Sequence, residues 1–173
     1  DGRRPGWAER DIMRSLALAG GLAGALALSQ YPEFSQQYVQ RLSGAEDELR
    51  GVTIAFDAAA RLGGLSREEA LRALRGSSFG DQFSDDMRAR LYRYERLNAD
   101  YQALAPASPL GRLAQVWRLR DSDLVQRTWN AYQPAVPVTG DGLIASAIGF
   151  MGGWGLVSGL GALLFGRRRR RRA

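Results

Sequence analysis

LIASAIGFMGGWGLVSGLGALLF runs from Leu143 to Phe165 without a charged residue, and Gly166 and six consecutive arginines follow it. A helix needs about 20 apolar residues to cross the hydrocarbon core of a bilayer, so this stretch is long enough for one span. Basic segments next to a span favour the cytoplasmic side. The stretch therefore predicts a transmembrane helix over 143–165 and a cytoplasmic arginine tail over 166–173.

The excess of basic residues is confined to that tail. The chain has a net charge of +6, whereas residues 35–142 hold 14 arginines and 14 acidic residues. Because the central part of the chain is neutral, we expect no nucleic acid as partner. Next to a span, an arginine tail favours anionic lipid head groups. The expected lipid-binding residues are Arg167, Arg168, Arg169, Arg170, Arg171 and Arg172.

The chain contains no cysteine, no histidine and no lysine. This composition excludes the usual zinc sites, haem sites and cysteine or histidine nucleophiles. Acidic clusters at residues 46–48, 68–69 and 85–86 are the remaining candidates for metal binding or acid–base catalysis. Since adjacent positions of a helix do not face each other, we expect no catalytic residue, no metal site, no cofactor and no enzymatic activity.

A second apolar segment, LALAGGLAGALAL, covers Leu16–Leu28 and is extended by further apolar residues up to Phe34. One interpretation is a cleaved signal peptide that starts at Met13, with Ala25-Leu26-Ala27 as its cleavage site. The other is a retained transmembrane helix over 15–34 that follows a cytoplasmic segment, 1–14. We favour the retained helix because the helical pattern continues past Tyr31 without a linker.

Both apolar segments carry small residues at helical spacing, which lets two helix backbones approach closely in lipid. This spacing favours contact between the two spans or self-association. The residues concerned are Gly20, Gly24, Gly149 and Gly153.

Basic residues flank the two spans on their outer sides, so both chain ends are expected in the cytoplasm and residues 35–142 in the periplasm of a bacterium. The hydrophobic residues of the central region follow a helical period. After Pro32, an apolar stripe with alternating spacings of four and three is typical of a coiled-coil seam between helices. The stripe consists of Tyr38, Leu42, Ala45, Leu49, Val52 and Phe56.

The rest of the central region predicts a turn and a broken helix that returns. Ser66-Arg67-Glu68-Glu69 is a capping box that opens a short helix. Ser84 is expected to cap the next helix, and Ser108 with Pro109 to open another. The arginines between Arg88 and Arg96 alternate with other residues and are interpreted as a solvated helix face. We predict an all-α protein in which two transmembrane helices flank a periplasmic helical hairpin or small helical bundle.

Three stretches resemble a bacterial family known only as a domain of unknown function, number twenty-nine thirty-seven. They are PEFSQQYVQRLSGAEDEL (32–49), GLSREEAL (64–71) and QPAVPVTGDGL (133–143). The resemblance covers nearly the whole chain from Met13 onward. It implies a small inner-membrane protein with two spans, and it implies no activity.

These features favour a non-enzymatic integral protein of the bacterial inner membrane. We expect an accessory or scaffold subunit that packs against other membrane protein subunits. The alternative is a self-assembling homo-oligomer that forms a ring or a pore. The two hypotheses differ in which surface the glycine faces contact.

Overall fold

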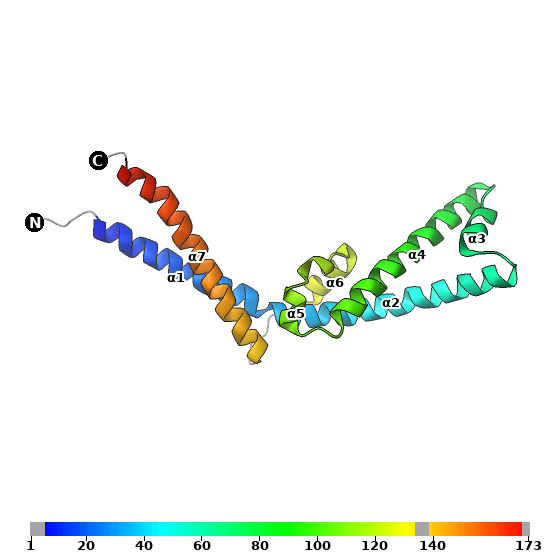
Figure 1. Cartoon of the computed structure of the whole chain (residues 1–173), viewed down its shortest axis with the longest axis horizontal. Coiled ribbons are helices and arrows are strands. Elements are labelled where there is room, and N and C mark those ends of the chain that lie inside the picture. Colours follow the sequence, from blue (N-terminus) through cyan, green and yellow to red (C-terminus); the bar gives the residue numbers. More distant parts are fainter. Residues whose placement is uncertain (1–5, 134–138, 171–173) are drawn as a thin grey trace, which may run out of the picture. The chain divides into compact units, whose positions relative to one another are not determined.

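The computed structural model describes residues 6–133 and 139–170, with side chains over 11–133 and 139–163. The described residues are all-α, as the sequence predicts, and contain no strand. Figure 1 shows the helices along the chain. They are α1 (Gly6–Ser29), α2 (Tyr31–Leu62), α3 (Arg67–Ala73), α4 (Ser78–Leu104), α5 (Pro109–Leu113), the 3-10 turn η1 (Val116–Arg118), α6 (Ser122–Ala131) and α7 (Gly140–Arg170).

The chain forms two compact units, which we describe separately. The helix-pair unit consists of Asp1–Ser35 and Gln133–Ala173, and the hairpin domain is Gln36–Tyr132. The helix α2 begins in the first unit and belongs to the second from Gln36 onward. Only Gln30 separates α1 from α2, and its carbonyl accepts a hydrogen bond of 3.1 Å from the Phe34 amide.

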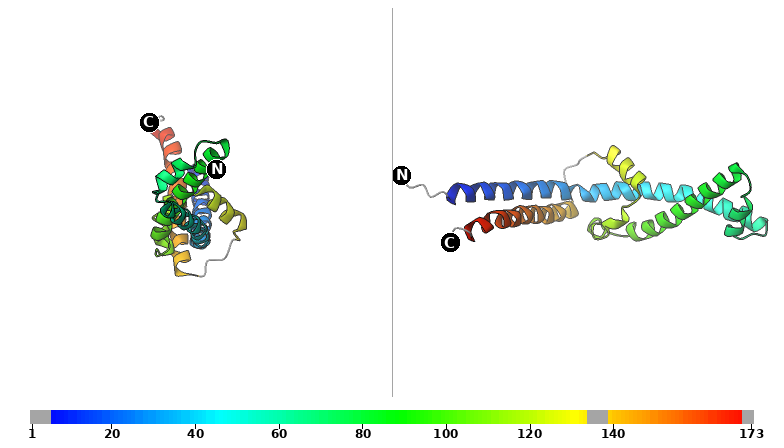
Figure 2. Two further views of the ribbon diagram at one scale, coloured as in Figure 1. Left: turned by 90° about the vertical axis from the view of Figure 1, so that its right-hand side faces the viewer. Right: turned by 90° about the horizontal axis from the view of Figure 1, so that it is seen from above.

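In the helix-pair unit, α1 and α7 lie side by side, as both Figure 1 and Figure 2 show. Two helical stretches of the described residues are long and apolar enough to cross a membrane. They lie within Asp11–Leu62, near the N-terminus, and within Gly140–Leu163. Length and composition are the basis of this assignment.

The hairpin domain is built from α2, which leads out, and α4, which returns, with the short α3 between them (Figure 1). The helix α2 ends at two glycines. Gly64 has a φ of +70°, a left-handed conformation that glycine adopts without strain. The Leu65 amide then donates to the Ala60 carbonyl at 2.9 Å, and the Gly64 amide donates to the Arg61 carbonyl at 3.0 Å. This pair of bonds satisfies carbonyl groups that the helix end would leave free.

Side-chain caps set the starts of α3, α5 and α6, and the sequence predicts the first two of them. The Ser66–Glu69 capping box opens α3, Ser108 caps α5 with Pro109 behind it, and Asp121 caps α6. The prediction for Ser84 is wrong. The helix α4 already begins after Ser77, whose side chain accepts from the Gly80 amide, and Ser84 is buried within the helix and donates to the Leu71 carbonyl at 2.8 Å.

The core of the hairpin domain joins three helices. Its buried side chains come mainly from one face of α2 and from the second half of α4, and α6 covers them with a single leucine. The cluster consists of Tyr38, Val39, Leu42, Leu49, Leu97, Leu104 and Leu124.

Candidate functional site

Two glycine pairs form the contact between α1 and α7. A Cβ placed on Gly24 would overlap the Gly149 carbonyl, and one on Gly149 would overlap the Gly24 carbonyl. One turn further along, Gly153 meets the Gly20 carbonyl in the same way. The four glycines that the sequence singles out are thus placed against one another, and the two backbones are closer than any side chain would allow.

Larger side chains complete this contact on either side of the glycines. The Phe150 ring packs against Gly21, because a Cβ built on Gly21 would lie only 2.8 Å from the Cε2 atom of Phe150. The Met13 side chain lies against Gly161 in the same manner. A different face of α7 stays open, because no atom lies within 4 Å of a Cβ built on Gly152, Gly155 or Gly159.

The first four residues of the predicted α2 stripe pack in the core of the hairpin domain, whereas the last two do not. Tyr38 and Leu42 are fully buried, Leu49 is nearly so, and Ala45 packs against the same core cluster. Val52 and Phe56, the last two members, are half-buried and lie outside that cluster.

Asp121 is the acceptor for two arginines of α4. Its carboxylate receives hydrogen bonds from Arg93 at 3.0 and 3.1 Å and from Arg96 at 3.0 Å. It also accepts from the Leu124 amide at 3.2 Å as the cap of α6. Arg93 and Arg96 are only about a third exposed, so the interpretation of the α4 arginines as a solvated face is wrong for these two.

Asp100 is also held by two arginines, but the elements that carry the acid and the arginines are reversed. Here the acidic residue is on α4, and the arginines come from the end of η1 and from the segment that follows it. Arg118 donates to Asp100 at 3.1 Å, and Arg120 donates at 3.0 and 3.3 Å. Asp100 and Asp121 are both nearly inaccessible. We call this set of side chains the ion-pair lattice: Arg93, Arg96, Asp100, Arg118, Arg120 and Asp121.

The lattice fixes one register of residues 118–121 along α4, because a shift would bring like charges together. It also keeps Asp121 ionised. Burial alone would raise the pKa of Asp121, but the hydrogen bonds from Arg93 and from the Leu124 amide outweigh it and hold the pKa below its usual value. No local pattern in the sequence points to this lattice, since the residues that pair are 18 to 28 positions apart.

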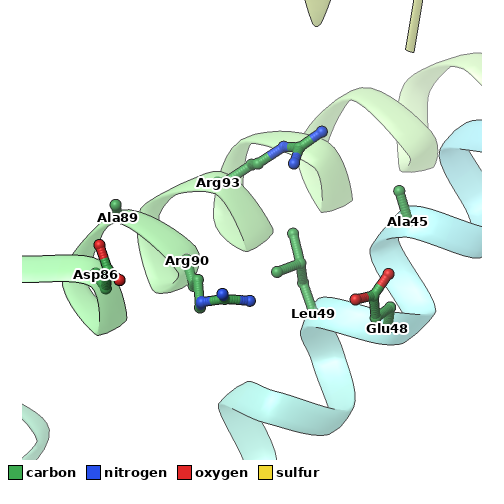
Figure 3. Close-up of a pocket in the computed structure, with 7 residues that line it drawn as sticks. All are labelled: Ala45, Glu48, Leu49, Asp86, Ala89, Arg90 and Arg93. Carbon is green, nitrogen blue, oxygen red and sulfur yellow. The ribbon is translucent and has the colours of Figure 1, made fainter. Parts of the chain in front are cut away.

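An open groove lies between α2 and α4 (Figure 3). It has a volume of about 340 Å³ and is lined by Ala45, Glu48 and Leu49 of α2 and by Asp86, Ala89, Arg90 and Arg93 of α4. The Arg90 side chain extends toward Leu49 across the groove in Figure 3.

The acidic clusters do not converge on a common point. Glu68 receives a hydrogen bond from Arg88, Glu69 closes the capping box, and Asp85 pairs with Arg75. In residues whose side chains are described, no group of three or more acidic side chains could hold a metal ion. The side chains of Arg167 to Arg172 lie outside the described residues, so the expected lipid contacts remain a prediction.

No curated protein and no solved structure matches the chain. One family model does, over residues 12–171, and its description is "Protein of unknown function (DUF2937)". This match spans the two helices of the helix-pair unit and the whole hairpin domain. It agrees with the three stretches that resemble the family in the sequence, and the chain belongs to the DUF2937 family.

Proposed function

We propose that this chain is a non-enzymatic integral membrane protein that acts as an accessory or scaffold subunit of a larger assembly. In this proposal α1 and α7 cross the bacterial inner membrane, both chain ends are cytoplasmic, and the hairpin domain is periplasmic. The tail of six arginines supports the orientation, because basic residues next to a span favour the cytoplasmic side.

The observation that carries the proposal is the exposed apolar surface around the glycine contact. The two helices pack through glycine backbone and leave their large apolar side chains outside. In water such a surface would cause aggregation, whereas lipid or a neighbouring membrane helix would cover it. The exposed residues include Leu18, Leu22, Leu26, Met151, Leu156, Leu160 and Leu163.

The polar chemistry of the hairpin domain supports a structural role. Two of its buried carboxylates, Asp100 and Asp121, are each held by two arginines. A catalytic acid or base needs contact with substrate, and these carboxylates already use their acceptor sites within the domain. The groove is open and lined by charged side chains, unlike the enclosed apolar pockets of most small-molecule sites.

Native mass spectrometry of the full chain, extracted from its own membranes in detergent, tests the proposal. We expect a fixed number of copies bound to one or more foreign membrane subunits. Substituting large apolar residues on the outer face, such as Leu22→Ser with Leu156→Ser, should reduce the foreign subunits recovered. If the chain is recovered only alone or only with itself, the proposal is wrong.

The open face of α7 favours a second candidate function, a self-assembling ring or pore. Gly152, Gly155 and Gly159 expose backbone there, and small residues of this kind allow close helix contact in lipid. The same mass spectra separate the two functions, because self-assembly predicts many copies of this chain and no foreign subunit.

A further inference from the structure

The groove between α2 and α4 carries charges of both signs, and its α4 wall holds Asp86 as well as Arg90 and Arg93. Glu48 lies on the α2 wall and Arg90 on the α4 wall, with Leu49 between them (Figure 3). Both charged residues are exposed, and the structure gives neither a hydrogen bond nor an ion pair within the described part of the chain. Glu48 and Arg90 thus leave one unpaired charge of each sign in the groove, and the same two residues of a second copy would complement them.

The apolar stripe of α2 is only partly covered next to the groove. A stripe at heptad spacing buries its residues only where a second helix runs along it. Within the domain, that cover is complete at Leu42 and Leu49, but Val52 and Phe56 stay half-buried. Ala45 and Leu49 of the stripe line the groove, and Val52 and Phe56 follow them along α2 outside it. A second copy that docks in the groove and extends along α2 would also cover Val52 and Phe56.

We propose that a second copy of this chain docks in the groove, with Glu48 of each copy opposite Arg90 of the other. A two-fold axis repeats every contact, so one complementary pair becomes two. Both partners then find the opposite charge that neither finds within its own chain. The inference concerns the hairpin domain alone. It holds whether or not a foreign subunit covers the helix-pair unit, so it does not rest on the proposed function.

Charge reversal in the full chain in detergent tests the pairing. Two copies with different affinity tags are co-expressed, and the yield of mixed complexes is measured. Glu48→Arg in both copies, or Arg90→Glu in both copies, places like charges opposite each other twice. Because like charges across an interface are strongly unfavourable, we expect mixed complexes to fall at least about tenfold for each variant. Asp47→Arg and Arg50→Glu change the same charges on exposed positions of α2 outside the groove, and they should have little effect.

Mixing the two variants distinguishes contact between copies from contact within one chain. When one tagged copy carries Glu48→Arg and the other Arg90→Glu, both cross-copy contacts have opposite charges again. We expect the mixed complex to return to the yield of the unaltered chain, well above either variant alone. If only the double variant within one chain restores the yield and mixing does not, Glu48 and Arg90 pair intramolecularly and the proposal is wrong.

A local readout guards against association through the helix-pair unit. The chain contains no cysteine, so one copy with Glu48→Cys and one with Arg90→Cys can be linked by a bismaleimide only between copies. We expect strong cross-linking for this combination and weak cross-linking for Asp47→Cys with Arg50→Cys. The absence of a cross-link, or an unaltered chain that is monomeric in detergent and in membranes, would overturn the proposal. Binding of a foreign subunit through the groove in place of a second copy would also overturn it.

Discussion

Asp121 is 5% exposed and binds two arginine side chains and one backbone amide. Asp121→Asn removes the charge and leaves Arg93 and Arg96 without their anionic partner. Since hydrogen bonds to buried charged groups contribute about 1.5–3 kcal/mol, we expect the free energy of unfolding to fall by about 2 kcal/mol. Thermal unfolding of the full chain in detergent measures the loss. Asp123→Asn is the matched control, because Asp123 is about half exposed and its pairs should contribute less than about 1 kcal/mol.

The lowered pKa of Asp121 fixes the sign of a pH dependence. The unfolded chain binds the proton at a higher pH than the folded chain does. The stabilisation is therefore complete above the unfolded-state pKa and is lost as the pH falls through the folded-state pKa. We expect the unfolding temperature to fall as the pH drops below the ordinary aspartate pKa of about 4, and to fall less in Asp121→Asn. An equal fall in both proteins would assign the acid sensitivity to other carboxylates.

The ion-pair lattice marks the limit of what the sequence predicts about single residues. Arg93 and Arg96 look like members of a solvated helix face because only their neighbours on the helix are visible in the sequence. Their partner Asp121 follows 25 to 28 residues later, in the turn before α6. No periodicity links an arginine on one helix to an aspartate in a distant turn, so the pairing depends on the tertiary fold.

At the scale of helices, local signals predicted some boundaries well and failed where tertiary contacts decide. The capping box at Ser66 is a complete local motif, and the structure confirms it. Ser84 and Ser77 are equally good caps by residue type. The chain uses Ser77 because Gly80 packs directly on the Leu74 carbonyl, where no Cβ would fit. Gly80 thus lies within the first turn of α4, and the contact responsible is with the end of α3.

The glycine contact between α1 and α7 gives a prediction with a control on the same helix. Gly149→Ala and Gly153→Ala place a methyl group against the backbone of α1. The helices must then separate, and we expect a loss of about 1–3 kcal/mol, as for other overpacked interiors. Gly152→Ala and Gly159→Ala point into open space and should leave the unfolding temperature of the chain in detergent unchanged or raised. Equal destabilisation by all four would mean that the contact is absent.

The stripe of α2 gives a second prediction at this scale. Leu49 is buried in the core between α2 and α4, so Leu49→Asp places an unpaired charge there. We expect a loss of several kcal/mol, because a buried charge without a partner is strongly unfavourable. Ile54→Asp is the control, since Ile54 lies on the exposed side of the same helix. Circular dichroism during heating measures both. An unchanged melting curve for Leu49→Asp would show that this part of the stripe is exposed.

For the molecule as a whole, the orientation is a prediction that the absence of cysteine makes simple to test. Ser78 is exposed in the hairpin domain, and Ala173 ends the tail. In intact cells with a permeabilised outer membrane, a membrane-impermeant maleimide should label Ser78→Cys. It should label Ala173→Cys only after the inner membrane is opened. The reverse pattern would place the hairpin domain in the cytoplasm.

The arginine tail can interact with its surroundings in two ways: through charge alone with anionic lipids, or through the guanidinium groups with a specific partner. If Arg167 to Arg172 act only through charge, each is worth roughly 1 kcal/mol near an anionic leaflet before screening. Replacing all six with lysine should then leave insertion, orientation and assembly intact. Replacing them with glutamine should weaken the control of orientation, so that part of the population inverts or inserts less efficiently. The cysteine-labelling assay and native mass spectra measure both outcomes.

Loss of assembly in the lysine variant, with correct insertion, would show that the planar guanidinium is required. A partner with phosphate groups in a fixed geometry would then replace the general attraction to lipid.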